Sequence, residues 1–398
     1  MKPEQTIKIK TNFIKTYKSG YPLISKESII NSNDLREEGM LFNLVDDKHT
    51  FIARGYFGKQ NKGYGWILSR NENEQINSEF FAKKLADALQ LREKLFKSSD
   101  TTAYRVFNGE GDGIGGFTID YFNGYYLINW YSEGIYTFKK QIIDALEKLV
   151  KFKAIYQKKR FDTTGQYIEE DDFVCGERGD FPIIVKENGV NFSVYLDDGA
   201  MVGVFLDQRE VRRTIRDHYA NGKTVLNMFS YTGAFSVFAA LGGALKTTSV
   251  DLAKRSLSKT IEQFSVNDID HQAQDIIVED VFNYFKYAGR KKLKFDMVIL
   301  DPPSFARSKK FTFSAAKDYT NLLKDTIVIT EDNGLIVAST NCSTFSMKKF
   351  KSFVETAFKE SNCSYKIVEE FSLPDDFKTI PEYKEGDYLK VLFVKKLK

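Results

Sequence analysis

The sequence predicts an α/β protein in which a doubly wound parallel sheet follows two smaller domains. The chain has 398 residues, which is too long for one ordinary hydrophobic core. Short apolar runs separated by turn residues occupy the N-terminal segment, and from Lys186 onward apolar strands alternate with helical segments. We therefore expect a β-rich domain, an α+β domain and an α/β domain at 1–75, 76–185 and 186–398.

The composition excludes several classes of protein. Apolar residues make up 42% and charged residues 28%, and 26 Gly with seven Pro leave no room for a long disordered or collagen-like segment. Three cysteines without a CxxC pair argue against a disulfide framework, and three scattered histidines argue against zinc chemistry, so we expect no metal site. An N-terminus without an apolar signal segment fits a cytoplasmic protein.

The first expected domain has the pattern of a small β-barrel-like module. Between Glu37 and Leu68, short apolar runs alternate with turn residues. The net charge of the chain is only +4, but residues 1–75 hold twelve Lys and Arg against nine Asp and Glu. This small excess is weak support for contact with a polyanion, because such excesses usually belong to solvated faces.

The second expected domain opens with apolar residues at helical spacing from Phe81 to Leu95. Two or three strands, a helix at 138–152 and a strand at 154–159 follow. The glycine-rich turn at 108–116 precedes a strand and not a helix, so we assign it to a turn without a ligand.

The third expected domain alternates strands with helices. Strands are predicted at 223–229, 245–251, 275–280, 295–303, 334–340, 365–372 and 388–396, and helices at 235–243, 253–267, 317–330 and 348–361. The uncharged stretch 224–245 is long enough to span a bilayer, but polar residues in its middle favour a strand, a loop and a helix.

Polar residues follow the predicted strands of this domain. The segment Ser230–Ala234 follows the first strand, and Asp251, Asp280 and Asp301 follow three others. In such folds ligands bind beyond the carboxyl ends of the strands, and a Rossmann dehydrogenase shares the small-residue turn and the first acidic residue. The turn lacks GxGxxG, however, so a nucleoside ligand without phosphates fits better.

Six motifs together resemble a known family. They are FLDQR (Phe205 to Arg209), VLNMFSYTGAFS, Val250-Asp251, DPPSF (Asp301 to Phe305), NCS around Cys342 and EGDYLK (Glu385 to Lys390). In this order they resemble the bacterial large-subunit rRNA cytosine-C5 methyltransferases, which are class I enzymes with an N-terminal PUA domain and a small α/β linker domain. The resemblance covers nearly the whole chain. It implies a Rossmann-like methyltransferase domain, S-adenosylmethionine as cofactor and ribosomal RNA, 23S in bacteria, as partner.

The resemblance also implies roles for individual residues. Asp251 would bind the cofactor ribose, Asp280 the adenine side, and the Ser230 to Gly233 loop the methionine end. The cofactor-binding residues that it implies are Asp207, Gln208, Arg209, Phe229, Ser230, Tyr231, Thr232, Gly233, Asp251, Asp280 and Asp301. From the residues alone, Asp251 and Asp280 are equally typical of helix N-caps or turns. Relatives commonly carry a histidine in the segment before EGDYLK that this chain lacks.

Methylation of cytosine at C5 requires a thiolate that first adds to C6, because C5 alone is a poor nucleophile. Cys342 follows a predicted strand and matches the catalytic cysteine of the family, and Asp301 would pair with the base. The alternative for any cysteine in apolar surroundings is an inert buried thiol, which suits Cys363 and Cys175.

RNA contacts are expected around the DPPSF motif. Pro302 and Phe305 would hold a base that has left its helical stack, although Phe305 also suits a core position. The following loop carries basic residues interleaved with aromatic residues, which suits a phosphate backbone or simply a solvated loop: Arg307, Lys309, Phe311, Lys310, Phe313 and Lys317.

Two other functions remain open on the sequence. The DPPSF motif also suits methylation of an amine of guanine or adenine in RNA, a reaction that needs no cysteine. The chain could also be an RNA-binding scaffold with a degenerate methyltransferase fold. The sequence is compatible with a monomer and with a homodimer.

Overall fold

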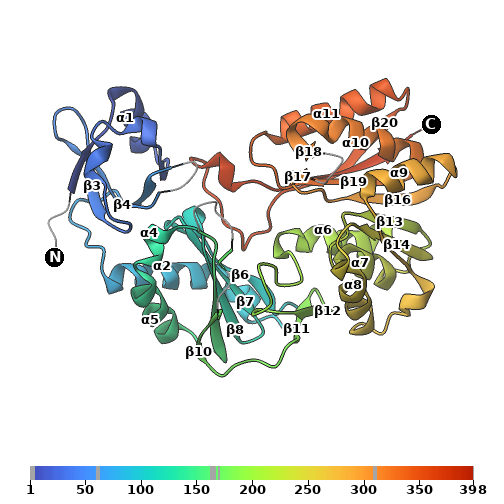
Figure 1. Cartoon of the computed structure of the whole chain (residues 1–398), viewed down its shortest axis with the longest axis horizontal. Coiled ribbons are helices and arrows are strands. Elements are labelled where there is room, and N and C mark those ends of the chain that lie inside the picture. Colours follow the sequence, from blue (N-terminus) through green and yellow to red (C-terminus); the bar gives the residue numbers. More distant parts are fainter. Residues whose placement is uncertain (1–4, 60–62, 162–166, 169–170, 308–311, 398) are drawn as a thin grey trace. The chain divides into compact units, whose positions relative to one another are not determined.

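The computed structural model describes residues 5–59, 63–161, 167–168, 171–307 and 312–397. These residues form two compact units, and the chain passes between the units more than once (Figure 1). The first unit comprises Met1–Val185, Val194–Val202 and Asp375–Gly386. The second unit comprises Lys186–Ser193, Gly203–Pro374 and Asp387–Lys398.

The N-terminal part of the first unit is a five-stranded sheet. In order of pairing, its strands are β1 (Gln5–Lys8), β3 (Leu41–Val45), β4 (Phe51–Phe57), β5 (Gly65–Ser69) and β2 (Leu23–Ile24). Helix α1 (Thr11–Lys18) and the 3₁₀ turns η1 (Lys26–Ser28) and η2 (Ser32–Asp34) connect them. Apolar side chains such as Phe42, Leu44 and Ile52 fill the core. The expected β-rich module is confirmed.

The rest of the first unit is built on a second five-stranded sheet. In order of pairing, its strands are β10 (Phe173–Gly176), β9 (Ala154–Lys159), β8 (Tyr125–Trp130), β7 (Phe117–Phe122) and β6 (Ala103–Asn108). Its helices are α2 (Ser78–Leu91), α3 (Glu93–Phe96), α4 (Glu133–Tyr136) and α5 (Lys139–Leu149). The glycine-rich segment forms the turn η3 (Gly109–Asp112) between β6 and β7, and β7 and β8 form a hairpin, as expected.

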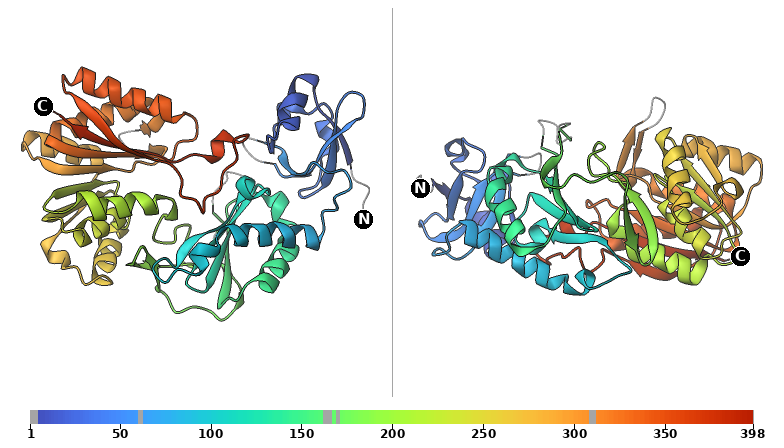
Figure 2. Two further views of the ribbon diagram at one scale, coloured as in Figure 1. Left: turned by 180° about the vertical axis from the view of Figure 1, so that it is seen from behind. Right: turned by 90° about the horizontal axis from the view of Figure 1, so that it is seen from below.

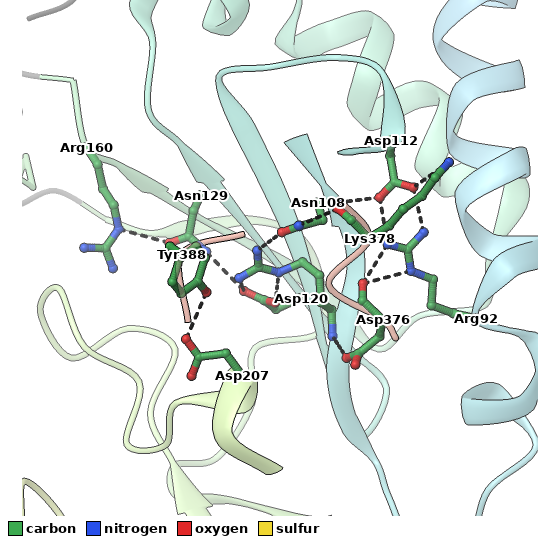
Figure 3. A network of polar contacts seen from close by, with 11 residues as sticks. Arg92, Asn108, Asp112, Asp120, Asn129, Arg160, Asp207, Asp376, Lys378 and Tyr388 are labelled. Carbon is green, nitrogen blue, oxygen red and sulfur yellow. Dashed lines mark hydrogen bonds and ion pairs between the residues drawn. The ribbon is translucent and has the colours of Figure 1, made fainter. Parts of the chain in front are cut away.

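Residues 375–386, red in Figure 1, belong to the first unit although they come late in the chain. The Arg92 guanidinium donates to the Asp112 carboxylate at 2.7 and 2.8 Å and to the Asp376 main-chain carbonyl at 2.7 and 3.2 Å (Figure 3). The Asp376 carboxylate accepts the main-chain N–H of Arg105 at 2.9 Å. Because the Arg92 and Asp112 side chains are almost fully buried, this network replaces the water that both charges would otherwise need.

The second unit is built around a seven-stranded sheet. In order of pairing, its strands are β15 (Asp275–Val278), β14 (Lys246–Asp251), β13 (Thr224–Met228), β16 (Phe295–Leu300), β19 (Thr330–Thr340), β21 (Lys390–Lys396) and β20 (Tyr365–Phe371). The first five are parallel, whereas β21 pairs antiparallel with β19 and β20. The doubly wound α/β sheet is confirmed, with an antiparallel edge. The strand order reverses between β13 and β16, which is where such folds bind ligands.

Helices cover both faces of this sheet (Figures 1 and 2). They are α6 (Arg209–Thr214), which continues into the π-turn η5 (Ile215–Tyr219), α7 (Ala234–Leu241), α8 (Arg255–Ser265), α9 (Val281–Arg290), α10 (Ala315–Ile329) and α11 (Met347–Glu360). On β16, Ile299 packs in a cluster with residues of α6 and α7, whereas Val298 packs in a cluster with residues of α9, α10 and α11. Strands buried on both faces explain the continuous apolar runs of the sequence.

The remaining helical turns and strands of the chain are short. They are the turns η4 (Leu206–Gln208), η6 (His271–Ala273) and, in the first unit, η7 (Lys384–Gly386), and the hairpins β11 (Ile183–Glu187) with β12 (Val190–Val194) and β17 (Phe305–Arg307) with β18 (Thr312–Ser314). The uncharged stretch 224–245 forms β13, a loop and α7, as expected. In the part of the chain that the structure describes, no helix has both the length and the apolar character of a membrane span.

Helix α9 is an element that the apolar pattern did not predict. Its sequence, VFNYFKYAGR, is rich in aromatic residues of modest helix propensity and contains Gly289. The Asp280 carboxylate caps it by accepting the N–H groups of Phe282 and Asn283 at 3.0 and 3.2 Å. Its buried face then packs against the sheet.

The buried ion pair of the first unit predicts a strong effect of Arg92→Met. The change leaves the Asp112 carboxylate buried without its partner, so we expect the free energy of unfolding to fall by about 3–5 kcal/mol. Urea unfolding followed by circular dichroism measures this change. Lys97→Met, which breaks an exposed pair with Glu93, is the control and should leave the midpoint nearly unchanged. Equal midpoints for both variants would contradict the assignment.

Candidate active site

A cavity of about 360 Å³ lies at the carboxyl ends of β13, β14 and β16 in the second unit. This volume falls within the range of roughly 300 to 1,000 Å³ that is common for ligand pockets. Its lining residues are Phe205, Asp207, Gln208, Arg212, Phe229, Ser230, Tyr231, Ala234, Phe235, Asp251, Leu252, Asp280, Val281, Phe282, Asp301, Pro302, Pro303, Ala306, Phe313 and Asn341.

The loop after β13 adopts an unusual backbone. Phe229 and Tyr231 have φ angles of 60° and 52°, which side chains other than glycine rarely adopt, and Gly233 has 78°. Hydrogen bonds hold this shape, because the Ser230 N–H donates to the Val250 carbonyl at 3.1 Å and the Gly233 N–H to the Ser230 carbonyl at 2.7 Å. The loop therefore brings main chain close to the cavity between two strands.

Asp251, at the end of β14, holds this loop in place. One carboxylate oxygen accepts the Tyr231 N–H at 2.9 Å, and the other accepts the Ala253 N–H at 2.9 Å. The turn role considered on the sequence is therefore present. Each oxygen can accept a further hydrogen bond, and Asp251 lines the cavity, so the turn role does not exclude a contact with a ligand.

Asp280, like Asp251, has a structural role and also lines the cavity. It caps α9, the alternative that its sequence position left open, and it also lines the cavity. Phe282, on the first turn of that helix, lies against Phe313 with ring centroids 5.9 Å apart, and both rings line the cavity. One end of the cavity is thus a carboxylate beside an apolar, aromatic wall.

Asp301 stands at the end of β16. Burial, and to a smaller degree the neighbouring charge of Asp207, raise the pKa of its carboxyl from the usual 3.8 to about 6. Hydrogen bonds with Gln208 and Ser339 and the charge of Arg212 act in the opposite direction. A carboxyl in this state can accept a proton near neutral pH.

The charges of the lining residues are unbalanced. Four of these residues are aspartates, and Arg212 is the one basic residue among those that the structure describes. The Arg212 guanidinium is already paired with the Glu187 carboxylate through two hydrogen bonds of 2.7 Å. An anionic cavity of this kind suits a cationic ligand with hydroxyl donors and disfavours phosphate.

The DPPSF segment is placed in part as expected. Pro302 lines the cavity, whereas Phe305 lies on β17, 62% exposed, and is not among the lining residues. Phe305 is therefore no core ring. Arg307 ends β17, and Lys309 and Lys310, with Phe311, lie outside the described residues.

Phe313 corrects one expectation about the basic loop. It is only 1% exposed and packs in the core beside the cavity, so its ring is unavailable to RNA bases in solution. Lys317, on the first turn of α10, is exposed. Among the described residues of this stretch, Phe313 therefore belongs to the core and Lys317 to the surface.

Cys342 follows β19 and is buried at 6% exposure. It packs in the apolar cluster of the second unit, with its Sγ 3.1 Å from the Thr344 hydroxyl, and it is not among the lining residues of the cavity. The preceding residue, Asn341, does line the cavity and accepts a hydrogen bond from the Ser304 hydroxyl at 2.6 Å. The proposed role of Cys342 stays a prediction.

The structure thus brings most of the predicted residues together. The cavity is lined by Asp207, Gln208, Phe229, Ser230, Tyr231, Asp251, Asp280, Asp301 and Pro302, but not by Arg209, Thr232, Gly233, Phe305 or Cys342. The Thr232 hydroxyl instead donates to the Gly203 carbonyl at 2.6 Å, which holds the loop after β13 against the segment around Gly203. Asn341 and the aromatic wall were missed, because nothing in the sequence shows which side chains near a strand end face a cavity.

Comparison with known proteins identifies relatives over the whole chain. Residues 104–394 match the family model of S-adenosylmethionine-dependent methyltransferases, and residues 7–70 match a model of a PUA-like domain. YwbD of Bacillus subtilis (strain 168), provisionally named a ribosomal RNA large subunit methyltransferase, is 64% identical over 95% of this chain and 96% of its own. Ribosomal RNA large subunit methyltransferase I of Alteromonas mediterranea is 29% identical over 95% of both chains.

A solved structure is similar over its full length. The crystal structure of SMU.776 complexed with SAH has a TM-score of 0.90 and 37% sequence identity, and the match covers 98% of this chain and 99% of that chain. The similarity extends over both units, so the fold described above is shared as a whole.

The raised pKa of Asp301 predicts a pH-dependent effect of Asp301→Asn. Between pH of about 4 and 6 the Asp301 carboxyl is protonated in the folded protein but already ionised in the unfolded chain, so its contribution to wild-type stability falls as the pH rises through this range. Asparagine does not titrate, and the variant should gain stability relative to wild type as the pH rises. Urea unfolding at the two ends of the range measures this gain. Asp217→Asn, which removes a carboxylate whose pKa is lowered by Arg216, is the control and should gain no stability relative to wild type as the pH rises. If the stability difference between Asp301→Asn and wild type were the same at both pH values, the raised pKa of Asp301 would be refuted.

Proposed function

The chain belongs to the S-adenosylmethionine-dependent methyltransferases, and on this premise we propose that it methylates a base of large-subunit ribosomal RNA, 23S in bacteria, in the cytoplasm. The names of its relatives support the substrate, and the PUA-like match at residues 7–70 supports an RNA-binding N-terminal domain. The division at 1–75, 76–185 and 186–398 belongs to this proposal. The alternative of an RNA-binding scaffold without activity is not supported, because the cavity keeps all four aspartates that the enzyme would need.

The observation that carries the proposal is the anionic cavity. S-adenosylmethionine is a cation without phosphate, and its ribose offers two hydroxyl donors. Asp251 would accept from the ribose, Asp280 would face the adenine side, and the loop Ser230 to Gly233 would approach the methionine end of the cofactor. Apolar residues such as Leu252 complete the adenine side.

The order of the strands orients the bound cofactor. Asp280 and Asp251 follow β15 and β14, whereas Asp301 follows β16 on the other side of β13. With adenosine at the first two, the reacting end lies toward Asp301. The cofactor supplies there a methyl group on a positively charged sulfur, which a nucleophile can attack.

The groups beside the reacting end favour transfer to a nitrogen of a purine base. Asp301, Pro302 and Asn341 line the cavity and offer acceptors for a base amine, whereas Cys342 is only 6% exposed and is not among the lining residues. The amine nitrogen would form the new bond to carbon as the carbon–sulfur bond breaks, and the Asp301 carboxylate would accept the amine proton. No residue of this chain would need to become covalently linked to the base.

Methylation of cytosine at C5 is the second candidate. It rests on Cys342, which lies directly beside Asn341, and on the buried ammonium of Lys390, 3.2 Å from the Cys342 carbonyl. In this route the thiolate would add to C6, and a base would later remove the C5 proton so that the thiolate can leave. In the structure the Cys342 sulfur lies 3.1 Å from the Thr344 hydroxyl and does not line the cavity.

Asp251→Ala tests the cofactor site. The change removes the expected ribose contact and the acceptor that holds the Tyr231 N–H, so the Kd for S-adenosylmethionine should rise at least about tenfold. Isothermal titration calorimetry measures the affinity. Asp217→Ala, an exposed carboxylate away from the cavity, should bind like wild type. An unchanged Kd for Asp251→Ala would remove this residue from the site.

Cys342→Ala separates the two reactions. If a nitrogen is methylated, transfer of labelled methyl to unmodified large-subunit RNA should stay within a few-fold of wild type, and nucleoside analysis should yield a methylated purine. If C5 is methylated, activity should fall by at least about 10²-fold, because the covalent step is lost, and the wild-type product is 5-methylcytidine. Cys363→Ala, a half-buried thiol elsewhere, is the control and should retain activity.

A further inference from the structure

The EGDYLK motif contains a residue whose role the proposed site does not yet explain. The Tyr388 hydroxyl donates to one oxygen of the Asp207 carboxylate at 2.9 Å (Figure 3). We propose that Tyr388 is a positioning residue, which orients the Asp207 carboxylate toward the cationic amino group of the amino-acid part of S-adenosylmethionine. This inference rests on the proposed function of the cavity.

Asp207 lies on a short element beside the cavity. The turn η4 (Leu206–Gln208) has three residues and follows an irregular segment. The Tyr388 hydroxyl, bound to one carboxylate oxygen, constrains the orientation of the group. A carboxylate can accept several hydrogen bonds, so Asp207 can also accept from a ligand in the cavity that it lines.

Tyr388 is itself held from two sides. Its main-chain carbonyl accepts a hydrogen bond from the Lys390 ammonium at 2.9 Å, and Lys390 is only 5% exposed. Its ring packs against the apolar cluster of β19, β21 and α7. A tyrosine held by the sheet in this way presents its hydroxyl to the Asp207 carboxylate at a fixed position.

The location of Asp207 identifies the part of the cofactor that it faces. Asp207 is bonded to Tyr388, just before β21, and the neighbouring Gln208 accepts a hydrogen bond from the Ser339 hydroxyl of β19 at 3.3 Å. Asp207 therefore lies on the side of the cavity near β16 and β19, away from β15 and Asp280. With adenosine at Asp251 and Asp280, the amino-acid part of the cofactor is the part that extends toward Asp207. The amino group there is cationic, and a carboxylate held at a fixed angle is the matching acceptor.

Calorimetry with two ligands tests this assignment. S-adenosylhomocysteine carries the amino-acid part, and 5′-methylthioadenosine lacks it. Tyr388→Phe should weaken S-adenosylhomocysteine about tenfold, the effect of losing one hydrogen bond to a charged group, and leave 5′-methylthioadenosine unchanged.

Tyr219→Phe is a matched control. Its hydroxyl donates to the Glu369 carboxylate at 2.5 Å, and its ring packs against the same apolar cluster, but neither residue lines the cavity. This variant should bind both ligands like wild type. If the two tyrosine variants weakened both ligands equally, Tyr388 would have only a structural role and the inference would fall.

A double-mutant cycle shows whether Tyr388 acts through Asp207. Asp207→Asn should weaken S-adenosylhomocysteine, and adding Tyr388→Phe should change the affinity no further. If wild type does not bind S-adenosylhomocysteine at all, the proposed function of the cavity fails. If wild type binds, Asp207→Asn weakens binding and Tyr388→Phe does not, only the present inference fails.

Discussion

The parallel pairing of β13 with both β14 and β16 is the constraint on which the site depends. Met228 lies level with Val250 and Leu300, so the segments that follow the three strands emerge side by side. This register gathers several carboxylates in one cavity. The raised pKa of Asp301, which comes mainly from burial and partly from the charge of Asp207, reflects the cost of this arrangement. Main-chain N–H groups that donate to the Asp251 carboxylate offset part of the repulsion between the carboxylates. A cationic ligand in the cavity would offset more of it.

Most of the second unit could be predicted because its central strands are buried on both faces. Apolar runs predicted these strands, a weaker apolar pattern predicted the partly buried edge strands β15 and β20, and the residues after the strands predicted much of the cavity lining. Helix α9 was not predicted, because its many aromatic residues obscure the helical spacing of its apolar positions. The useful signal was Asp280, since the N-cap role that its sequence position suggested marks the start of this helix. The contact of Arg92 with Asp376, 284 residues later, has no local signal at all.

The site shows the same limit at closer range. Residue types and their order pointed to Asp251, Asp280 and Asp301, but orientation follows from packing that no spacing reveals. Cys342 and its neighbour Asn341 are adjacent in sequence, yet only Asn341 lines the cavity. The buried ammonium of Lys390 binds main-chain carbonyls on both sides of it, at Cys342 and Tyr388, and so fixes the ends of two strands relative to each other.

The late segment 375–386 has a consequence for how the protein is made. Translation proceeds from the N-terminus, and the Arg92 guanidinium must wait for the Asp376 carbonyl until most of the second unit has also been made. The first unit therefore reaches its final form late, even though most of its residues emerge early. A nascent chain stopped before this segment would keep Asp112 and Arg92 paired without the last partner of their network.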